Sequence, residues 1–251
     1  MLTKQQTAIL RAALDGGIPL DRVAEHLGSS AEMIRRRAQA LLDRTLDDVA
    51  APQSTAAIVP DPGGQNGFPG NGIARACAEF VVDGSMLFLG AGSVNVAVAG
   101  ALHGRHQLVL TNGLDVAQQL KNNETCDVVV ISGALRRSDR AIVGEAAVEF
   151  IGRFQADYAI VEASAVADDG AILGFDYVDV GVTRAFIANS RRTIIALVSP
   201  ADRTSTSVRI ADVNEVNCIV TSGELPPAVL LCCHSNGVDV IVLEGRAHSP
   251  G

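Results

Sequence analysis

The chain has 251 residues, of which 48% are hydrophobic, enough for a packed core in one large domain or in a large domain plus a small one. A net charge of −8 and a pI near 5.1 argue against a protein that coats nucleic acid nonspecifically, although a local basic face is compatible with them. The five cysteines lie in apolar stretches without CxxC spacing, which predicts reduced thiols and a cytoplasmic protein. We expect neither a secretory signal nor a membrane span, because the first ten residues lack an apolar core and the long uncharged stretch 85–102 is broken by glycines.

The first fifty residues have the spacing of a helix-turn-helix. Apolar residues recur at helical intervals through 20–42, with a break at 28–30. The second helix of such a motif enters the DNA major groove. Its candidate DNA contacts are Ser29, Ser30, Met33, Arg35, Arg36 and Arg37. A helical hairpin that serves as a dimerisation arm is the alternative, and the seven basic and seven acidic residues of 1–48 predict modest, salt-dependent DNA affinity.

Residues 51–72 are rich in Pro, Gly, Ser and Asn and are predicted to be a linker. From residue 73 to 251, short runs rich in Val and Ile alternate with amphipathic segments. We predict strands at 85–89, 107–111, 127–132, 157–162, 193–198, 217–221 and 238–243, an extended piece at 171–175, and helices at 73–82, 95–102, 113–121, 145–154, 178–190 and 226–234. This order predicts an α/β fold, a three-layer sandwich with a mostly parallel sheet.

Residues 87–95 contain the strongest local motif, a buried strand followed by Gly90-Ala91-Gly92-Ser93 and the start of a helix. Free backbone N–H groups and a hydroxyl at a helix N-terminus form a candidate phosphate site. A dinucleotide site would have a third glycine, where this chain has Asn95, and an acidic residue after the next strand, where it has Thr111-Asn112. A smaller phosphorylated ligand is therefore favoured, and an ordinary tight turn is the alternative reading.

Other candidate ligand contacts follow the next strands. Thr111 and Asn112 would bond sugar hydroxyls, although Asn112 is as well suited to capping the helix that follows. Arg136 and Arg137 lie in a polar loop, 133–140, which we expect to be flexible and able to fold over a phosphate, or else simply to be solvated. Asp168-Asp169-Gly170 fits a turn better than a catalytic pair. The five histidines form no metal-binding constellation, so we expect no metal and no cofactor.

In order and spacing, these motifs resemble the DeoR family of bacterial transcription regulators over almost the whole chain. The matching residues include Ile34-Arg35-Arg36, Asp83-Gly84, Gly90 to Ser93, Thr111-Asn112, Ser132-Gly133, Gly144, Asp169-Gly170, Thr183-Arg184-Ala185 and Ile219-Val220-Thr221. The resemblance implies a sensor domain with the fold of ribose-5-phosphate isomerase, a phosphorylated sugar as effector, operator DNA as partner and a homo-oligomer. It adds Gly133, Gly144, Asp169 and, in place of the family's usual lysine, Arg203 to the candidate ligand site.

Two alternatives remain open. An aldose-ketose phosphosugar isomerase would need a carboxylate base, for which Asp169 or Glu162 is available, but the Lys-Gly-x-Gly-Gly stretch of such isomerases is absent. A metabolite-binding protein with a decayed DNA-binding half is the other, because residues 44–56 are acidic where the family has a basic wing. We expect a ligand-responsive regulator rather than an enzyme.

Overall fold

The computed structural model describes residues 57–60, 70–174, 180–197 and 208–244, together with residues 20–21, 24, 30–32 and 34–35 near the N-terminus. The chain divides into two compact units, Met1–Ala51 and Pro52–Gly251, and each is treated separately below. Some of the candidate residues, namely Ser29, Met33, Arg36, Arg37 and Arg203, lie outside the described residues.

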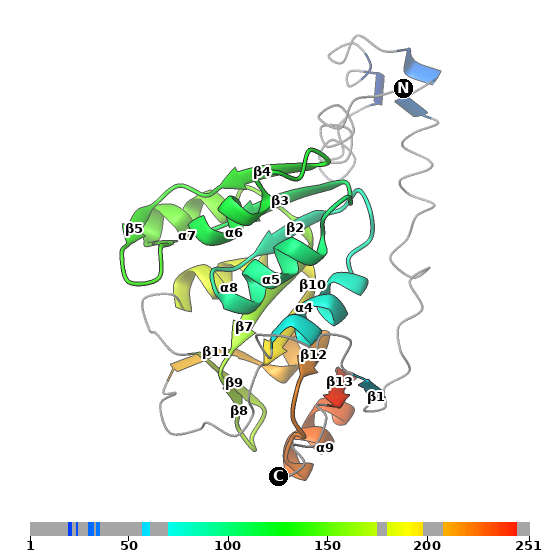
Figure 1. Cartoon of the computed structure of the whole chain (residues 1–251), viewed down its shortest axis with the longest axis vertical. Helices are drawn as coiled ribbons and strands as arrows, with labels where there is room; N and C mark the ends of the chain where they lie inside the picture. Colours follow the sequence, from blue (N-terminus) through cyan, green and yellow to red (C-terminus); the bar gives the residue numbers. More distant parts are fainter. Residues whose placement is uncertain are drawn as a thin grey trace, which may run out of the picture. The chain divides into compact units, whose positions relative to one another are not determined.

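The larger unit is built around an eight-stranded sheet in which every neighbouring pair is parallel (Figure 1). In spatial order its strands are β1 (Ala57–Pro60), β13 (Asp239–Glu244), β12 (Cys218–Thr221), β10 (Ser190–Leu197), β7 (Ala156–Ala163), β2 (Met86–Leu89), β3 (Gln107–Thr111) and β4 (Cys126–Val130). The central strands are continuous apolar runs because helices cover both of their faces.

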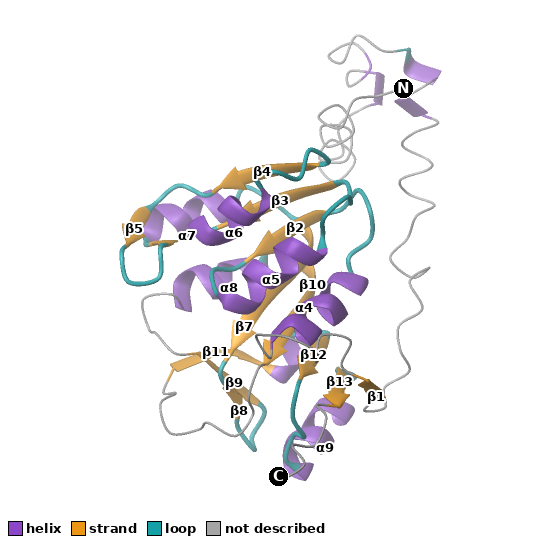
Figure 2. Cartoon of the chain, viewed as in Figure 1, coloured by secondary structure: helices purple, strands orange, loops and turns teal. Residues whose placement is uncertain are grey.

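Helices form the two outer layers (Figure 2). Their bounds are α4 (Gly70–Glu79), α5 (Ser93–Ala101), α6 (Leu114–Leu120), α7 (Glu145–Ile151), α8 (Val180–Ala188) and α9 (Pro227–Ser235). The first three pack side by side on one face of the sheet, α7 and α8 pack together on the other, and α9 packs beside β13. The predicted three-layer α/β fold with a mostly parallel sheet is confirmed.

The core on the α8 face is centred on two stacked aromatic rings. Phe88 of β2 and Phe186 of α8 are fully buried, with ring centroids 4.8 Å apart. Their neighbours on β2, Leu87 and Leu89, are also fully buried, as expected for a strand whose side chains alternate between two covered faces.

Short antiparallel elements account for most differences from the predicted elements. The loop 133–140, predicted to be flexible, contains β5 (Ala134–Arg136), which pairs with β6 (Ala141–Val143) in a hairpin. A second small sheet joins β8 (Ala165–Val166), β9 (Ala171–Gly174) and β11 (Val208–Asp212), the last of which leads into the 3-10 turn Val213–Glu215. The extended piece predicted at 171–175 corresponds to β9. The two- and three-residue strands β5, β6 and β8 are too short for a hydrophobic period to reveal them.

The predicted linker, 51–72, differs from the structure at two places. Residues 57–60 form β1, which pairs with β13 at the edge of the main sheet, and α4 already begins at Gly70. An edge strand is defined by its pairing with a distant segment, which a local composition rich in Pro and Gly does not disclose.

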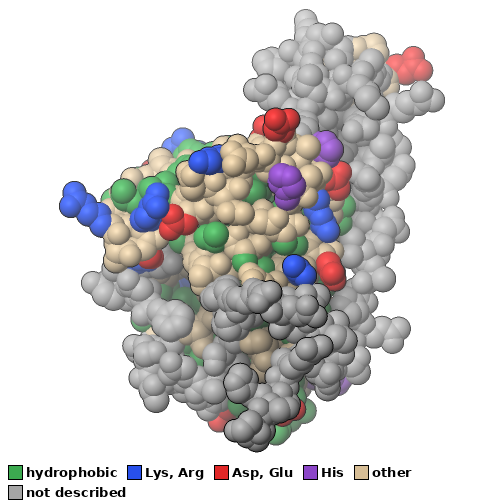
Figure 3. Space-filling view, in the orientation of Figure 1, with side chains coloured by type: hydrophobic (Ala, Val, Ile, Leu, Met, Phe, Trp, Pro, Cys, Tyr) green, Lys and Arg blue, Asp and Glu red, His purple; other side chains and the backbone are tan. Residues whose placement is uncertain are grey.

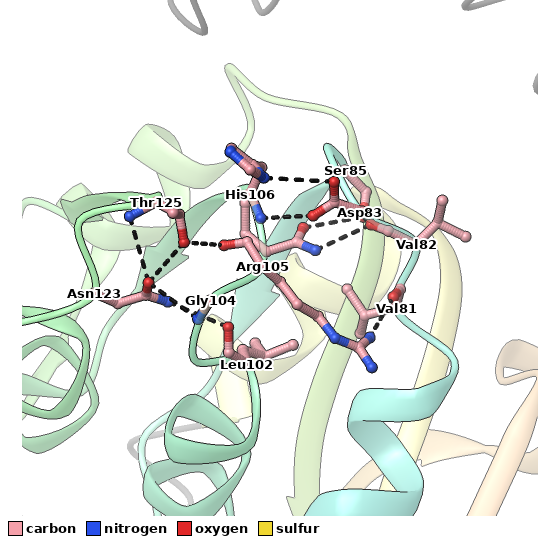
Figure 4. Close-up of polar contacts among 11 residues, drawn as sticks. Val81, Val82, Asp83, Ser85, Leu102, Gly104, Arg105, His106, Asn123 and Thr125 are labelled. Carbon is pink, nitrogen blue, oxygen red and sulfur yellow. Dashed lines mark hydrogen bonds and ion pairs between the residues drawn. The ribbon is translucent and has the colours of Figure 1, made fainter.

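Polar contacts join the loops at the amino ends of β2, β3 and β4 (Figure 4). The Arg105 guanidinium donates to the carbonyls of Ala78 and Val81 at 2.7 and 2.9 Å. The Thr125 hydroxyl donates to the Arg105 carbonyl at 2.8 Å, and the Asn123 amide donates to the Leu102 carbonyl at 3.2 Å. This network holds the loops at the end of the sheet opposite the site described below.

In the N-terminal unit, the residues described on both sides of the predicted turn are helical. Ala24 and Ile34 are buried, as their positions on the apolar face of a helical pair require. The Arg35 guanidinium forms an exposed ion pair with Asp21 at 2.7 Å.

Candidate functional site

A cavity of ≈ 980 Å³ lies at the carboxyl ends of β2, β3 and β7. Ligands of open parallel sheets bind at this edge, because the loops that leave the strands converge there. Its lining comes from α4, from the loop before α5 and the first turns of that helix, from α6, the β5–β6 hairpin and β7, and from β9, α8 and β11. The polar residues among it are Asn71, Ser93, Asp115, Gln119, Arg136, Ser138, Asp139, Glu162 and Thr183.

The loop predicted to bind phosphate opens onto this cavity. Ala91, Gly92 and Ser93 line it, and α5 begins at Ser93 with Gly92 as its N-cap. Gly92 has φ 138° and ψ 162°, a conformation that is essentially restricted to glycine. Gly90 is buried behind the loop and does not line the cavity. Its N–H donates a hydrogen bond to the Ile160 carbonyl.

A carboxylate of the protein already lies at the N-terminus of α5. Glu162, near the end of β7, accepts a hydrogen bond from the Asn95 backbone N–H at 2.9 Å, and the Val94 N–H also donates to it. Burial raises the pKa of the Glu162 carboxyl above its usual value, while these N–H donors act in the opposite direction. The N-terminus of α5, where the sequence predicts a bound phosphate, is thus in contact with a carboxylate of the protein itself.

Asn112 is held in a network of hydrogen bonds behind the loop. Its side chain is buried, accepts a hydrogen bond from the Ala91 N–H at 2.7 Å and donates to the Ile142 carbonyl at 3.3 Å. It is not among the residues that line the cavity, and α6 has no side-chain cap, so the predicted capping role is wrong. Asn112 instead fastens the glycine loop to the β5–β6 hairpin. Thr111 is likewise buried, and its hydroxyl accepts from the Gly113 N–H.

The β5–β6 hairpin contributes Arg136, whose guanidinium makes two hydrogen bonds to the Asp139 carboxylate. These bonds hold the pKa of Asp139 below its usual value. Arg137 is exposed and does not line the cavity, so of the two arginines only Arg136 is brought to the site. Figure 3 shows basic side chains beside acidic ones at the end of the molecule that carries β5.

Three other candidates lie away from the cavity lining. Asp169 accepts from the Ala171 N–H at 3.1 Å and pairs with Arg209 at 3.0 Å, so it belongs to a turn. Gly133 and Gly144 have φ of 151° and 101°, and they flank the hairpin without reaching the cavity. Their role in this structure is to let the backbone turn.

From the sequence, Glu162 was predicted only as a nominal base of the alternative isomerase. Neither Asp115 nor Thr183 was predicted to line the ligand site, although Thr183 belongs to one of the motifs shared with the family. A lone acid at the end of an apolar strand was the one available signal for Glu162. Within the described residues, no three His, Cys, Asp or Glu side chains are grouped so that they could hold a metal ion. No helix in that part of the chain is long and apolar enough to cross a membrane.

Comparison with known proteins identifies the family. A model of the DeoR C-terminal sensor domain matches residues 71–223, which span the loop, the hairpin and the cavity. The chain belongs to the DeoR family of transcription regulators. The predicted family is thereby confirmed.

Two DeoR-family relatives are glycerol-3-phosphate regulon repressors. The protein from Haemophilus influenzae is 34% identical over 70% of this chain and 69% of its own length. The protein from Escherichia coli is 31% identical over 86% of this chain and 88% of its own, a share that extends into residues 1–70. Among solved structures, the match to ribose 5-phosphate isomerase A from Methanocaldococcus jannaschii covers 55% of this chain and 53% of the isomerase chain, with a TM-score of 0.38 and 12% sequence identity.

Proposed function

We propose that this DeoR-family regulator is a repressor or activator of carbohydrate metabolism whose affinity for operator DNA changes when its sensor domain binds a phosphorylated sugar or a related metabolite. The observation that carries this proposal is the N-terminus of α5, which opens onto a cavity at the carboxyl ends of the strands. Backbone N–H groups and the helix dipole favour an anion at this position. The related repressors of glycerol-3-phosphate regulons support a small phosphate ester as ligand.

The DNA-binding half of the proposal rests on the second helix of the N-terminal motif. Arg35 is exposed there, and its ion pair with Asp21 is of a kind that contributes only about 0–1 kcal/mol, so phosphate or base contacts can replace it. The neighbouring candidates Ser29, Ser30, Met33, Arg36 and Arg37 complete the proposed DNA surface. Operator binding by a homo-oligomer would take place in the cytoplasm.

A mobility-shift titration with DNA from the upstream region of the protein's own gene tests the proposal. We expect sequence-specific binding that weakens as salt increases, and that millimolar glycerol 3-phosphate changes. Arg35→Ala should weaken binding by about 1–3 kcal/mol if the arginine reads a base, or reduce the salt dependence if it contacts a phosphate. Absence of sequence preference at this and other candidate operators would favour a metabolite-binding protein with a decayed DNA-binding half.

Phosphosugar isomerisation is the second candidate, because the cavity is lined by Glu162, one of the two bases considered for it. This carboxylate accepts hydrogen bonds from backbone N–H groups at the start of α5. In this position it stabilises the helix terminus and is poorly placed to remove a proton from a sugar carbon. We therefore expect no exchange of the C2 proton of aldose phosphates with solvent in NMR. Exchange that disappears in Glu162→Gln would establish the isomerase instead.

A further inference from the structure

Glu162 lies at the N-terminus of α5, where the proposed function expects the effector phosphate. Its carboxylate accepts hydrogen bonds from the backbone N–H groups of Val94 and Asn95 in the first turn of α5. A Cβ placed on Gly92 would overlap this carboxylate, which shows how closely the loop and the acid approach each other. A phosphate that used the same N–H groups would have to replace Glu162.

The charges around the cavity do not compensate for this acid. The described residues that line the cavity include three carboxylates, those of Asp115, Asp139 and Glu162, against the one guanidinium of Arg136. Arg136 is itself bonded to Asp139, and Asp115 is paired with Arg140 at 2.7 Å. An incoming anion therefore meets repulsion at the helix terminus and no uncommitted cation among these residues.

A buried amide lies next to the loop. Asn95 is fully buried, and neither Oδ1 nor Nδ2 of its side chain has a hydrogen-bond partner within the described part of the chain. Its Nδ2 would lie 3.3 Å from a Cβ on Gly90, so the amide is beside the glycine loop. An unsatisfied buried amide is costly, and a rearrangement of the loop that gave it a partner would recover that free energy.

We propose that Glu162 is the specificity-determining residue of this site, an internal anion that an effector phosphate must displace from the N-terminus of α5. The proposal rests on the proposed function. Because the Glu162 carboxylate is covalently part of the chain and lies beside the N-terminus of α5, it competes with ligands for these N–H groups at a high effective concentration. A bare phosphate ion gains too little to displace it, whereas a phosphate ester that also contacts the rest of the cavity gains enough. The sensor thereby rejects inorganic phosphate and responds to the esterified form.

The energetics of the free and bound states support displacement. Burial already penalises the charged Glu162 side chain, as the raised pKa of its carboxyl indicates. Movement into the water of the open cavity would relieve that penalty, so part of the cost of breaking its two N–H contacts is recovered. The effector phosphate, with more acceptor oxygens, would take over the same donors.

Calorimetric titration of the full chain at one fixed pH tests the proposal with inorganic phosphate and glycerol 3-phosphate as probes. In Glu162→Ala we expect affinity for inorganic phosphate to rise by about tenfold or more over the wild type, the size of a lost charged competitor. Glu162→Gln keeps the shape and one acceptor oxygen, so an intermediate gain is expected. Asp127→Asn removes the same unit of charge from β4, outside the residues that line the cavity, and should change affinity by less than about threefold.

The outcomes separate the two proposals. Equal binding of inorganic phosphate to the wild type and both Glu162 variants, each shown by thermal melting to be folded, would overturn the role of Glu162 while leaving the phosphate site in place. An equal gain in Asp127→Asn and Glu162→Gln would also overturn it, because general electrostatics would then suffice. If neither probe binds to any of the four proteins, the anion site of the proposed function is itself refuted, and the role of Glu162 with it.

Discussion

Gly92 shows how a single backbone position controls the site. With φ 138° and ψ 162° it lies where side chains other than hydrogen are strained, and a Cβ there would meet the Glu162 carboxylate. The conformation turns the chain from β2 into α5, so that Gly92 and Ser93, at the start of the helix, line the cavity. Both the direction of the helix and the position of Glu162 depend on the absence of a side chain at this residue.

We expect Gly92→Val to lower the free energy of unfolding by about 1–3 kcal/mol from backbone strain alone, and to abolish binding of glycerol 3-phosphate. Urea denaturation and calorimetry are the measurements. Gly92→Ala, made alone and together with Glu162→Ala, separates the causes, since the double variant removes the clash but keeps the strain. A Gly92→Ala protein as stable as the wild type would contradict the argument.

Asn112 acts on the site through the backbone. Asn112→Ala leaves the partly buried Ala91 N–H and the buried Ile142 carbonyl without this partner, so we expect a loss of about 1–3 kcal/mol in unfolding free energy and a weaker affinity for glycerol 3-phosphate. Asn123→Ala is the matched control, because Asn123 is also a buried asparagine bonded to a loop carbonyl, but at the opposite end of the sheet. It should lose similar stability while ligand affinity stays unchanged. Equal losses of affinity in the two folded variants would show that Asn112 has no local role.

At the scale of elements, the β5–β6 hairpin carries Arg136, the one arginine among the described residues that line the cavity. The bonds between Arg136 and Asp139 lower the pKa of the Asp139 carboxyl, so this interaction contributes stability above the usual pKa of 3.8 and is lost as the pH falls through the lowered value. Near neutral pH the pair is fully formed. The partly exposed carboxylate therefore competes with any ligand phosphate for the same guanidinium.

We predict that Asp139→Asn raises the affinity for glycerol 3-phosphate by about threefold or more, because Arg136 is released for bidentate contact with the phosphate. Arg136→Gln in the same background should cancel this gain, which makes it the control. Isothermal calorimetry at neutral pH measures both. A gain that persists without Arg136 would assign the effect to the lost carboxylate charge rather than to the released arginine.

At the scale of the whole molecule, the boundary between the two units decides which fragment is stable. The second unit begins at Pro52 and includes β1, which covers the outer edge of β13. Residues of β13 such as Val240 and Leu243 are buried. Removal of β1 would leave β13 as an exposed apolar edge strand, which favours aggregation.

We therefore expect a fragment of residues 52–251 to fold, to bind glycerol 3-phosphate as the full chain does, and to remain a homo-oligomer, since we assign the oligomer contacts to the sensor domain. A fragment of residues 61–251, which lacks β1, should melt at a lower temperature or aggregate. Size-exclusion chromatography with light scattering and thermal melting will compare them. A monomeric 52–251 fragment, or two fragments of equal stability, would refute the corresponding part of this prediction.

The sequence by itself determined the features that depend on neighbouring residues. The continuous apolar runs predicted the buried parallel strands, and Gly90 to Ser93 predicted the turn into a helix, because hydrophobic period and glycine conformation are local properties. The order of the motifs also identified the family. The short strands of the hairpin and β1 escaped this reasoning, since each is defined by its partner.

Only the tertiary structure decided which distant residues meet. Strand order places β7 next to β2, which brings Glu162 to the helix terminus of Asn95, a residue 67 positions earlier in the chain. The same packing turns Asn112 toward Ala91 and Ile142 rather than toward a ligand. The loop sequence specifies where the backbone N–H groups of α5 lack helical partners. Which carboxylate accepts hydrogen bonds from them depends on the pairing of β7 with β2, two strands that are remote in the sequence. The contact between Glu162 and the N-terminus of α5 is therefore a property of the sheet rather than of the loop.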